Sequence, residues 1–289
     1  MASLIEGNIS MSRSTLLLAL FLFIQPIAYA ETLVLGVYPY LNISEVLQRF
    51  DPLANYLSSA LNLPVEISVS HDYAEHIELV GKDFLDIAYL GPVSYVTILE
   101  KYKPKVLLGR IEVNGSINYR GAIIIRKNSP IQSLIDLKGK TFAFGDPKST
   151  MSHIVPHYML LNAGVEDKDL AAYKFLGNHE SVALSVLLGQ YDAGAVKTSV
   201  AKKYVQNNNL KILEWTPYVS EHVFVMKPNL EAKLQSKIQQ SFSALAKPEN
   251  LPILTNIKSS ITGFVEAKEN NYKNLREMLA TLRGAKIID

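Results

Sequence analysis

The segment Leu33-Val-Leu-Gly-Val37 begins an alternation of strand and helix patterns that continues along most of the chain. It is short and apolar, which is typical of a buried strand. Apolar residues then recur at helical spacing from Val46 to Leu61, and 65–69 is predicted as the next strand. Strands that alternate with helices favour a mostly parallel, doubly wound α/β sheet.

A second run of the same alternation begins at Gly121. Its predicted strands are 121–126, 140–144, 173–176, 192–196 and 211–215, with a helix over 131–137. No Gly/Ser/Pro-rich linker separates the two runs. The sequence therefore predicts two α/β lobes joined by crossing strands, with a hinge near Gly121 and Val223. We expect residues 31–120 and 223–289 to form lobe 1, and residues 121–222 to form lobe 2.

Composition excludes several classes of function. The chain has 289 residues, and its 29 Lys and Arg against 27 Asp and Glu give a net charge of +2. Such a balance provides no strongly basic face, so we expect no nucleic-acid partner. The chain contains no cysteine, which excludes disulfides, Cys-ligated zinc, iron–sulfur clusters and thiol catalysis.

The first thirty residues have the pattern of a cleaved signal peptide. A short positive region after Met11 is followed by an apolar run from Leu16 to Ile24 and by Ala28-Tyr-Ala30. The nine-residue run is shorter than the roughly 20 residues that span a bilayer. We expect residues 1–30 to be removed, with translation starting at Met1 or Met11, and no cysteine follows the run to carry a lipid. The mature protein is predicted to be exported to the periplasm.

The segment Gly145-Asp-Pro-Lys-Ser-Thr-Met-Ser152 follows a predicted strand and opens a helix. Ser149, Thr150 and Ser152 place hydroxyl groups beside free backbone N–H groups at the positive end of the helix dipole. This combination suits a tetrahedral oxyanion. Helix capping alone also accounts for Ser and Thr at this position, so both interpretations remain.

Four further residues are candidates because of where they stand relative to predicted strands. His179 opens a helix after a strand, where open α/β sheets bind ligands, although it also fits an exposed helix cap. Asp192 begins a predicted strand, where it is equally consistent with a turn residue and with a residue that faces the cleft. Tyr40 and Tyr89 lie at strand ends, where they can form the wall of a pocket or simply pack.

Metal and catalytic motifs are missing. His153 and His157 are four residues apart, and His71, Glu75 and His76 form a second group, but His-Glu-x-x-His is absent. Gly-x-Ser-x-Gly and the Walker A pattern are absent as well. We therefore expect no metal, no cofactor and no catalytic turnover.

A series of short motifs runs in order along the chain. They are Gly36-Val-Tyr-Pro, Asp86-Ile-Ala-Tyr-Leu-Gly-Pro92, Asp146-Pro-x-Ser-Thr150, Gly177-x-His179 and Gly189-x-x-Asp-Ala193. Over residues 31–284 the chain resembles the phosphate/phosphite/phosphonate-binding (PhnD-like) family of periplasmic substrate-binding proteins that serve ABC transporters. The resemblance implies a type II periplasmic binding fold, a monomeric protein, a ligand held between two lobes and a membrane permease as partner.

The resemblance also implies roles for individual residues. Ser149 and Thr150 match the family's anion clasp, His179 matches its cleft histidine, and Tyr40 and Tyr89 match its wall tyrosines. The chain departs from the family at Met151, where a serine is usual.

The chain also departs from the family at a second place. Family members that bind aminoalkyl phosphonates have acidic residues there that contact the ligand's amine. Lys197-Thr-Ser199 and Ser220-Glu-His222 stand at those stretches, so only Glu221 is acidic. Phosphate, phosphite or an alkylphosphonate is therefore expected rather than an aminoalkyl phosphonate. Two alternatives remain: a protein of this fold that signals to a membrane kinase or chemoreceptor, and a secreted enzyme.

Overall fold

The computed structural model describes residues 1, 32–206 and 210–288. Contacts between residues group Thr32–Asp289 into one compact unit. The predicted signal peptide lies outside the described residues, apart from Met1. Among the helices that the structure describes, none is long and apolar enough to cross a membrane.

The first sheet has six strands in the order β13-β4-β12-β3-β1-β2. They are β1 (Leu33–Val37), β2 (Val65–Val69), β3 (Ile87–Leu90), β4 (Val106–Val113), β12 (Val223–Met226) and β13 (Ile261–Val265). Strand β1 is parallel to β2 and β3, whereas β12 is antiparallel to β3 and β4, and β13 is antiparallel to β4. Strands from distant parts of the chain thus lie side by side in this sheet.

Two apolar clusters lie against the strands of this sheet. Helices that contribute to them include α1 (Ile43–Leu61), α2 (Tyr73–Gly81), α3 (Pro92–Lys101), α7 (Ala232–Ala244), α8 (Leu251–Ile257) and α9 (Lys273–Gly284). Helix α1 begins where the Asn42 side chain accepts a hydrogen bond from the Glu45 N–H, at 2.9 Å. Its buried face consists of the apolar residues whose spacing predicted the helix, except Leu47, which is exposed.

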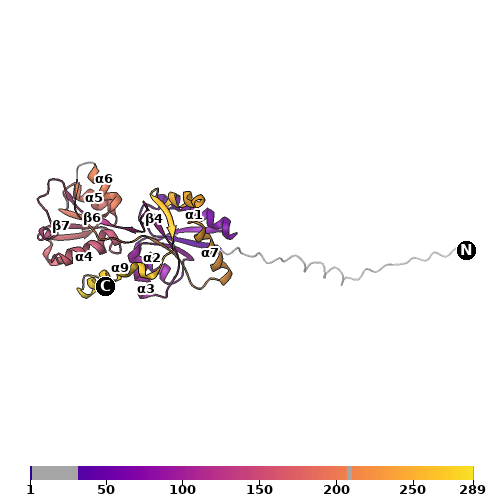
Figure 1. Ribbon diagram of the computed structural model, residues 1–289. Coiled ribbons are helices and arrows are strands. Elements are labelled where there is room, and N and C mark those ends of the chain that lie inside the picture. Colours follow the sequence, from indigo (N-terminus) through magenta and orange to yellow (C-terminus); the bar gives the residue numbers. More distant parts are fainter. Residues whose placement is uncertain (2–31, 207–209, 289) are drawn as a thin grey trace. The chain divides into compact units, whose positions relative to one another are not determined.

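The second sheet has five strands in the order β10-β6-β9-β7-β8. They are β6 (Gly121–Arg126), β7 (Thr141–Phe144), β8 (Ala172–Phe175), β9 (Ala193–Lys197) and β10 (Leu210–Trp215). The helices of this part are α4 (Val155–Asn162), α5 (His179–Leu187) and α6 (Thr198–Gln206), and Figure 1 shows them around β6 and β7. Strand β7 is parallel to β8 and β9, and β6 is antiparallel to its two neighbours.

The chain passes between the two sheets twice, once from β4 to β6 and once from β10 to β12. Each passage contains a two-residue strand, β5 (Asn118–Tyr119) and β11 (Val219–Ser220). These strands pair with each other in antiparallel register. The two crossings are therefore hydrogen-bonded to one another.

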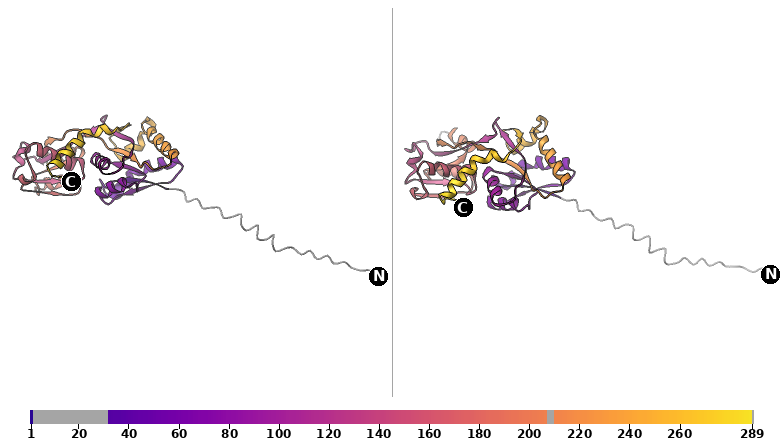
Figure 2. Two further views of the ribbon diagram at one scale, coloured as in Figure 1. Left: turned by 90° about the horizontal axis from the view of Figure 1, so that it is seen from below. Right: turned by 60° about the horizontal axis from the view of Figure 1, so that its bottom comes forward.

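The C-terminal helix α9 contacts both α3 and α4. Figure 2 shows this helix, in yellow, extending from the first sheet's side of the molecule toward the second's. The cluster that buries Leu275 and Leu279 of α9 also contains Ile154 and Val155, which follow β7 in the second sheet. Apolar packing thus joins the two sheets in addition to the crossing strands.

The structure confirms the α/β class with two sheets and corrects two predictions. Both sheets are mixed rather than mostly parallel, because the strands after each crossing run antiparallel to their neighbours. The helix predicted over 131–137 is only a 3₁₀ turn, Leu134–Leu137, which a Ser133–Asp136 capping box closes. Helix α8 and strand β13 were not predicted.

Candidate functional site

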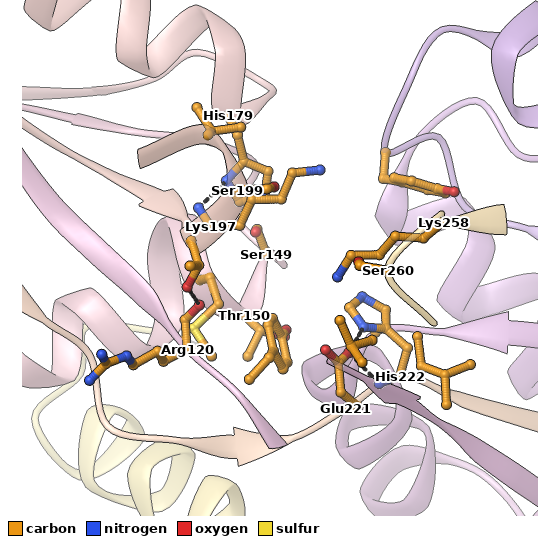
Figure 3. Close-up of a pocket in the computed structure, with 18 of the residues that line it drawn as sticks. Arg120, Ser149, Thr150, His179, Lys197, Ser199, Glu221, His222, Lys258 and Ser260 are labelled. Atoms are coloured by element: carbon orange, nitrogen blue, oxygen red, sulfur yellow. Dashed lines mark hydrogen bonds and ion pairs between the residues drawn. The ribbon is translucent and has the colours of Figure 1, made fainter. Parts of the chain in front are cut away.

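A cavity of about 1060 Å³ lies between the carboxyl ends of strands of the two sheets. Figure 3 shows its two walls. His179, Lys197, Ser149 and Thr150 come from one side, and Lys258, Ser260, Glu221 and His222 come from the other. Open α/β sheets bind ligands at such edges. We call this cavity the cleft.

Ser149 and Thr150 stand at the start of a helical segment in the cleft wall. A π-helical turn, Thr150–Ile154, follows Ser149 and continues directly into α4. The Ser149 hydroxyl oxygen accepts the Ser152 N–H at 3.3 Å, so this serine is an N-cap and a cleft residue at once. The Thr150 hydroxyl oxygen accepts the N–H of Val93 in the first turn of α3, at 3.2 Å. The first turns of the π-helical segment and of α3 therefore lie next to each other at these two hydroxyl groups.

His179 is held in one tautomer by the backbone. It is the first residue of α5, and the cap of that helix is Asn178, whose side chain accepts the Ser181 N–H at 2.9 Å. The Lys197 N–H donates to Nδ1 of His179 at 3.1 Å. Burial, followed by the nearby charges of Lys197 and His222, lowers the pKa of His179 to about 3. A neutral imidazole whose Nδ1 accepts carries its proton on Nε2. The idea that His179 is an exposed cap of its own helix is therefore wrong.

Tyr40 and Tyr89 line the opposite wall. Burial, partly offset by Arg49, raises the pKa of Tyr40 to about 12, so its hydroxyl is protonated at neutral pH. The ring of Tyr89 stacks on His222 with centroids 5.3 Å apart. His222 Nδ1 is 2.9 Å from the Glu221 carboxylate oxygen Oε2.

Glu221 is the acid at this end of the cleft. It is 1% exposed, and its second oxygen, Oε1, has no hydrogen-bond partner among the described residues. Burial raises the pKa of Glu221, but the hydrogen bond from His222 and the charges of His222 and Lys258 outweigh burial and lower the pKa overall. The carboxylate form is therefore held in place by neighbouring positive or hydrogen-bonding groups.

Positive charge predominates around the cleft. Seven of its lining residues are cationic, against three that are acidic. The cations are Arg49, Arg120, Lys148, Lys197, Lys202, Lys203 and Lys258, and the acids are Glu45, Glu180 and Glu221. Glu45 is paired with Arg49 at 2.7 Å, and Glu180 is paired with Lys203 at 3.2 Å. The cleft is thus much more positive than the chain's net charge of +2 indicates.

Two of the predicted site residues do not line the cleft. Ser152 is 1% exposed and packs beneath Gly145, whose N–H donates to the Ser152 carbonyl at 3.0 Å. Asp192 precedes β9, so it lies at the amino end of that parallel strand. Its carboxylate accepts the N–H and the hydroxyl of Thr141, each at 3.0 Å, and pairs with Arg126 at 3.4 Å. Asp192 therefore joins the beginnings of β7 and β9, at the edge opposite the cleft.

His153 of the π-helical turn and His157 of α4 belong to a structural chain of contacts. His153 Nδ1 is 2.7 Å from the Pro147 carbonyl, and its Nε2 is 3.0 Å from Nδ1 of His157. His157 Nε2 is 2.8 Å from Asp167 Oδ1. This chain of contacts positions the loop that precedes Ser149. No group of three potential metal ligands occurs among the residues that the structure describes.

Sequence reasoning missed several cleft residues. Lys197 ends β9, so its place at a carboxyl strand end was a usable signal. Lys258 and Ser260 follow α8, which was not predicted, and their positions had no comparable signal. Arg120 precedes β6 and lies over the rings of Trp215 and Tyr218, with its guanidinium carbon 4.3 and 4.9 Å from their centroids.

Comparison with known proteins gives consistent results. Residues 35–272 match the family described as "ABC transporter, phosphonate, periplasmic substrate-binding protein". A probable ABC transporter phosphite-binding protein, PhnD1 of Prochlorococcus marinus, is 24% identical over 86% of this chain and 89% of its own length. The phosphate-import protein PhnD of Mycolicibacterium smegmatis is 27% identical over 74% of this chain and 72% of its own.

Solved structures share the fold. PhnD1 of P. marinus in complex with methylphosphonate superposes with a TM-score of 0.76 at 23% identity, covering 88% of this chain and 99% of that one. The sulphonate-binding protein SsuA of Escherichia coli gives a TM-score of 0.61 at 14% identity, over 89% of this chain and 88% of that one. These likenesses confirm the type II periplasmic binding fold, and the family describes a binding protein rather than an enzyme. Because the family match extends over most of its length, the chain belongs to the periplasmic substrate-binding proteins of phosphonate ABC transporters.

Proposed function

We propose that the cleft captures a small phosphorus oxyanion, namely phosphate, phosphite or a phosphonate, and delivers it to a membrane ABC permease. The observation that carries the proposal is the placement of Ser149 and Thr150 at a helix start that faces an excess of cations. Helix beginnings bind anions through free N–H groups and the helix dipole. The relatives whose names mention phosphite, phosphate and methylphosphonate support the same class of ligand.

In this proposal Ser149 and Thr150 donate hydroxyl hydrogen bonds to the oxyanion. His179 donates from Nε2, because its Nδ1 already accepts the Lys197 N–H. Tyr40 and Tyr89 close the other wall, with Tyr40 protonated and able to donate. No covalent bond forms or breaks, so binding alone accounts for the activity.

Capture requires that the cleft can open and close. We propose that residues 31–120 and 223–289 move against residues 121–222, with the paired strands β5 and β11 as the hinge. A ligand that binds the closed form better shifts the equilibrium toward it. We further propose that residues 1–30 are cleaved on export and that the mature protein acts as a monomer in the periplasm.

Calorimetry on the purified mature chain tests the proposal. Phosphate, phosphite and methylphosphonate are titrated separately, with sulfate as a tetrahedral anion of another element. We expect saturable binding of at least one phosphorus oxyanion and its loss in the double variant Ser149→Ala/Thr150→Ala. Unaltered affinity in the double variant would contradict the assignment of Ser149 and Thr150 as oxyanion contacts. Binding of sulfate alone would overturn the proposed ligand class.

A further inference from the structure

Two of the four cleft lysines that form no ion pair among the described residues stand on opposite walls, and the other two are Lys148 and Lys202. Lys197 ends β9 on one wall, and Lys258 follows α8 on the other (Figure 3). No ion pair within 4.0 Å involves either of them among the described residues, whereas the cleft's Lys203 is paired with Glu180. Charged groups that are taken out of water are normally paired. Neither cation thus has an acid in direct contact, although the charge of Lys258 acts on Glu221 from a longer distance.

The surroundings of Lys197 strengthen this point. Its Nζ lies 5.7 Å from the centroid of the Tyr40 ring, so the side chain extends across the cleft. Burial and then the charge of Lys258 lower the pKa of Lys197. The two ammonium groups thus repel one another across the cleft. An anion between them would turn that repulsion into two attractive contacts.

In this conformation the cleft is also larger than one oxyanion requires. It encloses about 1060 Å³, whereas a water molecule occupies about 30 Å³ and a tetrahedral oxyanion is only a few times larger. Ser149, Thr150 and Lys197 belong to one wall of this space, and Lys258 belongs to the other. A ligand with two polar ends can contact both.

We propose that the ligand of this cleft carries a second anionic group, such as a carboxylate, which lies between Lys197 and Lys258 while the phosphorus oxyanion occupies the Ser149–Thr150 clasp. This inference rests on the proposed function and narrows its substrate class. An ammonium tail is disfavoured, because it would face two cations. The acid available to it, Glu221, has one oxygen bonded to His222, which leaves only Oε1 to accept from an ammonium group.

Calorimetry with compounds of similar length tests the second anionic group. The probes are 3-phosphonopropionate, propylphosphonate and 2-aminoethylphosphonate. We expect 3-phosphonopropionate to bind at least about tenfold more tightly than propylphosphonate, the scale of one hydrogen bond to a charged group, and 2-aminoethylphosphonate to bind most weakly. Equal or tighter binding of either of the other two would overturn the inference while leaving the proposed function intact.

Charge-removing variants locate the effect. Lys197→Met and Lys258→Met are each expected to weaken 3-phosphonopropionate about tenfold and propylphosphonate by a much smaller factor. Lys233→Met removes the same charge from an exposed position of α7 outside the cleft, and should preserve the preference. Equal weakening of both compounds by Lys197→Met would place this lysine in the oxyanion clasp and overturn the inference. Failure of all three compounds, phosphate and phosphite to bind would overturn the proposed function as well.

Discussion

The backbone N–H of Lys197 donates to Nδ1 of His179 across 3.1 Å. This contact joins the end of β9 to the beginning of α5, and it determines which face of the imidazole can donate. A histidine at the edge of a ligand cleft is often a pH-dependent group. Here, backbone contact and burial make it a neutral donor instead.

We predict that His179 does not titrate between about pH 5 and 8, because its pKa is lowered to about 3 from an ordinary value near 6.5. Nitrogen-15 NMR of the imidazole should show a protonated Nε2 and an unprotonated Nδ1 throughout this range. His71, whose side chain is 89% exposed, provides an internal comparison in the same spectra. A midpoint near 6.5 for His179 would contradict the prediction.

The stability of the fold should fall as the solution is acidified below about pH 6.5. Burial lowers the pKa of His76 to about 4, and burial together with His157 lowers that of His153 to about 4. Between the unfolded value near 6.5 and these folded values, the unfolded chain binds more protons, so its free energy falls relative to the folded chain. Each such group contributes on the order of 1 kcal/mol per pH unit in that window.

Urea unfolding at about pH 7.5 and pH 5 measures this loss of stability. His76→Gln keeps a hydrogen-bonding side chain near Ser70 and Tyr89 but cannot take a proton, so its pH dependence should be shallower. His71→Gln, at an exposed position, should leave the slope as it is in the unaltered chain. A slope that is the same in all three proteins would contradict the assignment to buried histidines.

Ser149→Ala should lower stability as well as affinity, because Ser149 caps the π-helical turn through its bond with the Ser152 N–H. Loss of an N-cap costs about 0.5–2 kcal/mol. Ser133→Ala removes a serine hydroxyl that donates to Asp136 at the 3₁₀ turn outside the cleft, and it should reduce stability without changing affinity. Thermal unfolding without ligand, combined with calorimetry, separates the two effects. Full retention of stability by Ser149→Ala would show that the cap contributes nothing.

Gly121→Ala should destabilise the fold where the chain enters the second sheet. A Cβ there would lie 2.7 Å from the Val196 carbonyl oxygen and 3.0 Å from Cβ of Met151. Both neighbours are buried and cannot move freely, so a cost of about 1–3 kcal/mol is expected. Gly284→Ala in α9, where a Cβ would meet nothing within 4 Å, is the matched control and should be neutral or stabilising. Urea unfolding of both variants gives the comparison, and equal stability would refute the steric argument.

Much of the fold was predictable, because its strands are short apolar runs between helices with one apolar face. Strands β1, β2 and β6 have the bounds expected from sequence. Strand direction was not predictable in the same way, since the crossings that reverse it depend on pairing between distant segments such as β3 and β12. Strand β13 was missed for a similar reason: it is held at a sheet edge by β4, about 150 residues earlier.

The site was predictable where a candidate follows a strand. Ser149, Thr150 and His179 come after the carboxyl ends of β7 and β8, and all three line the cleft. Asp192 was ambiguous because the sequence allowed both a turn and a place in the cleft. Its hydrogen bond from Thr141 puts it at the amino end of β9, away from the cleft. Ser152 was grouped with its neighbours by sequence distance, but the π-helical turn directs it inward.

The excess of cations around the cleft has a kinetic consequence. A chain with a net charge of +2 attracts anions only weakly from a distance, but seven cationic residues around one concavity focus the field there. Anions that diffuse within about 10 Å, the screening length at moderate salt, are drawn toward the mouth of the cleft before any hydrogen bond forms. The rate of encounter should therefore fall as ionic strength rises, while the dissociation rate, which short-range hydrogen bonds control, changes far less.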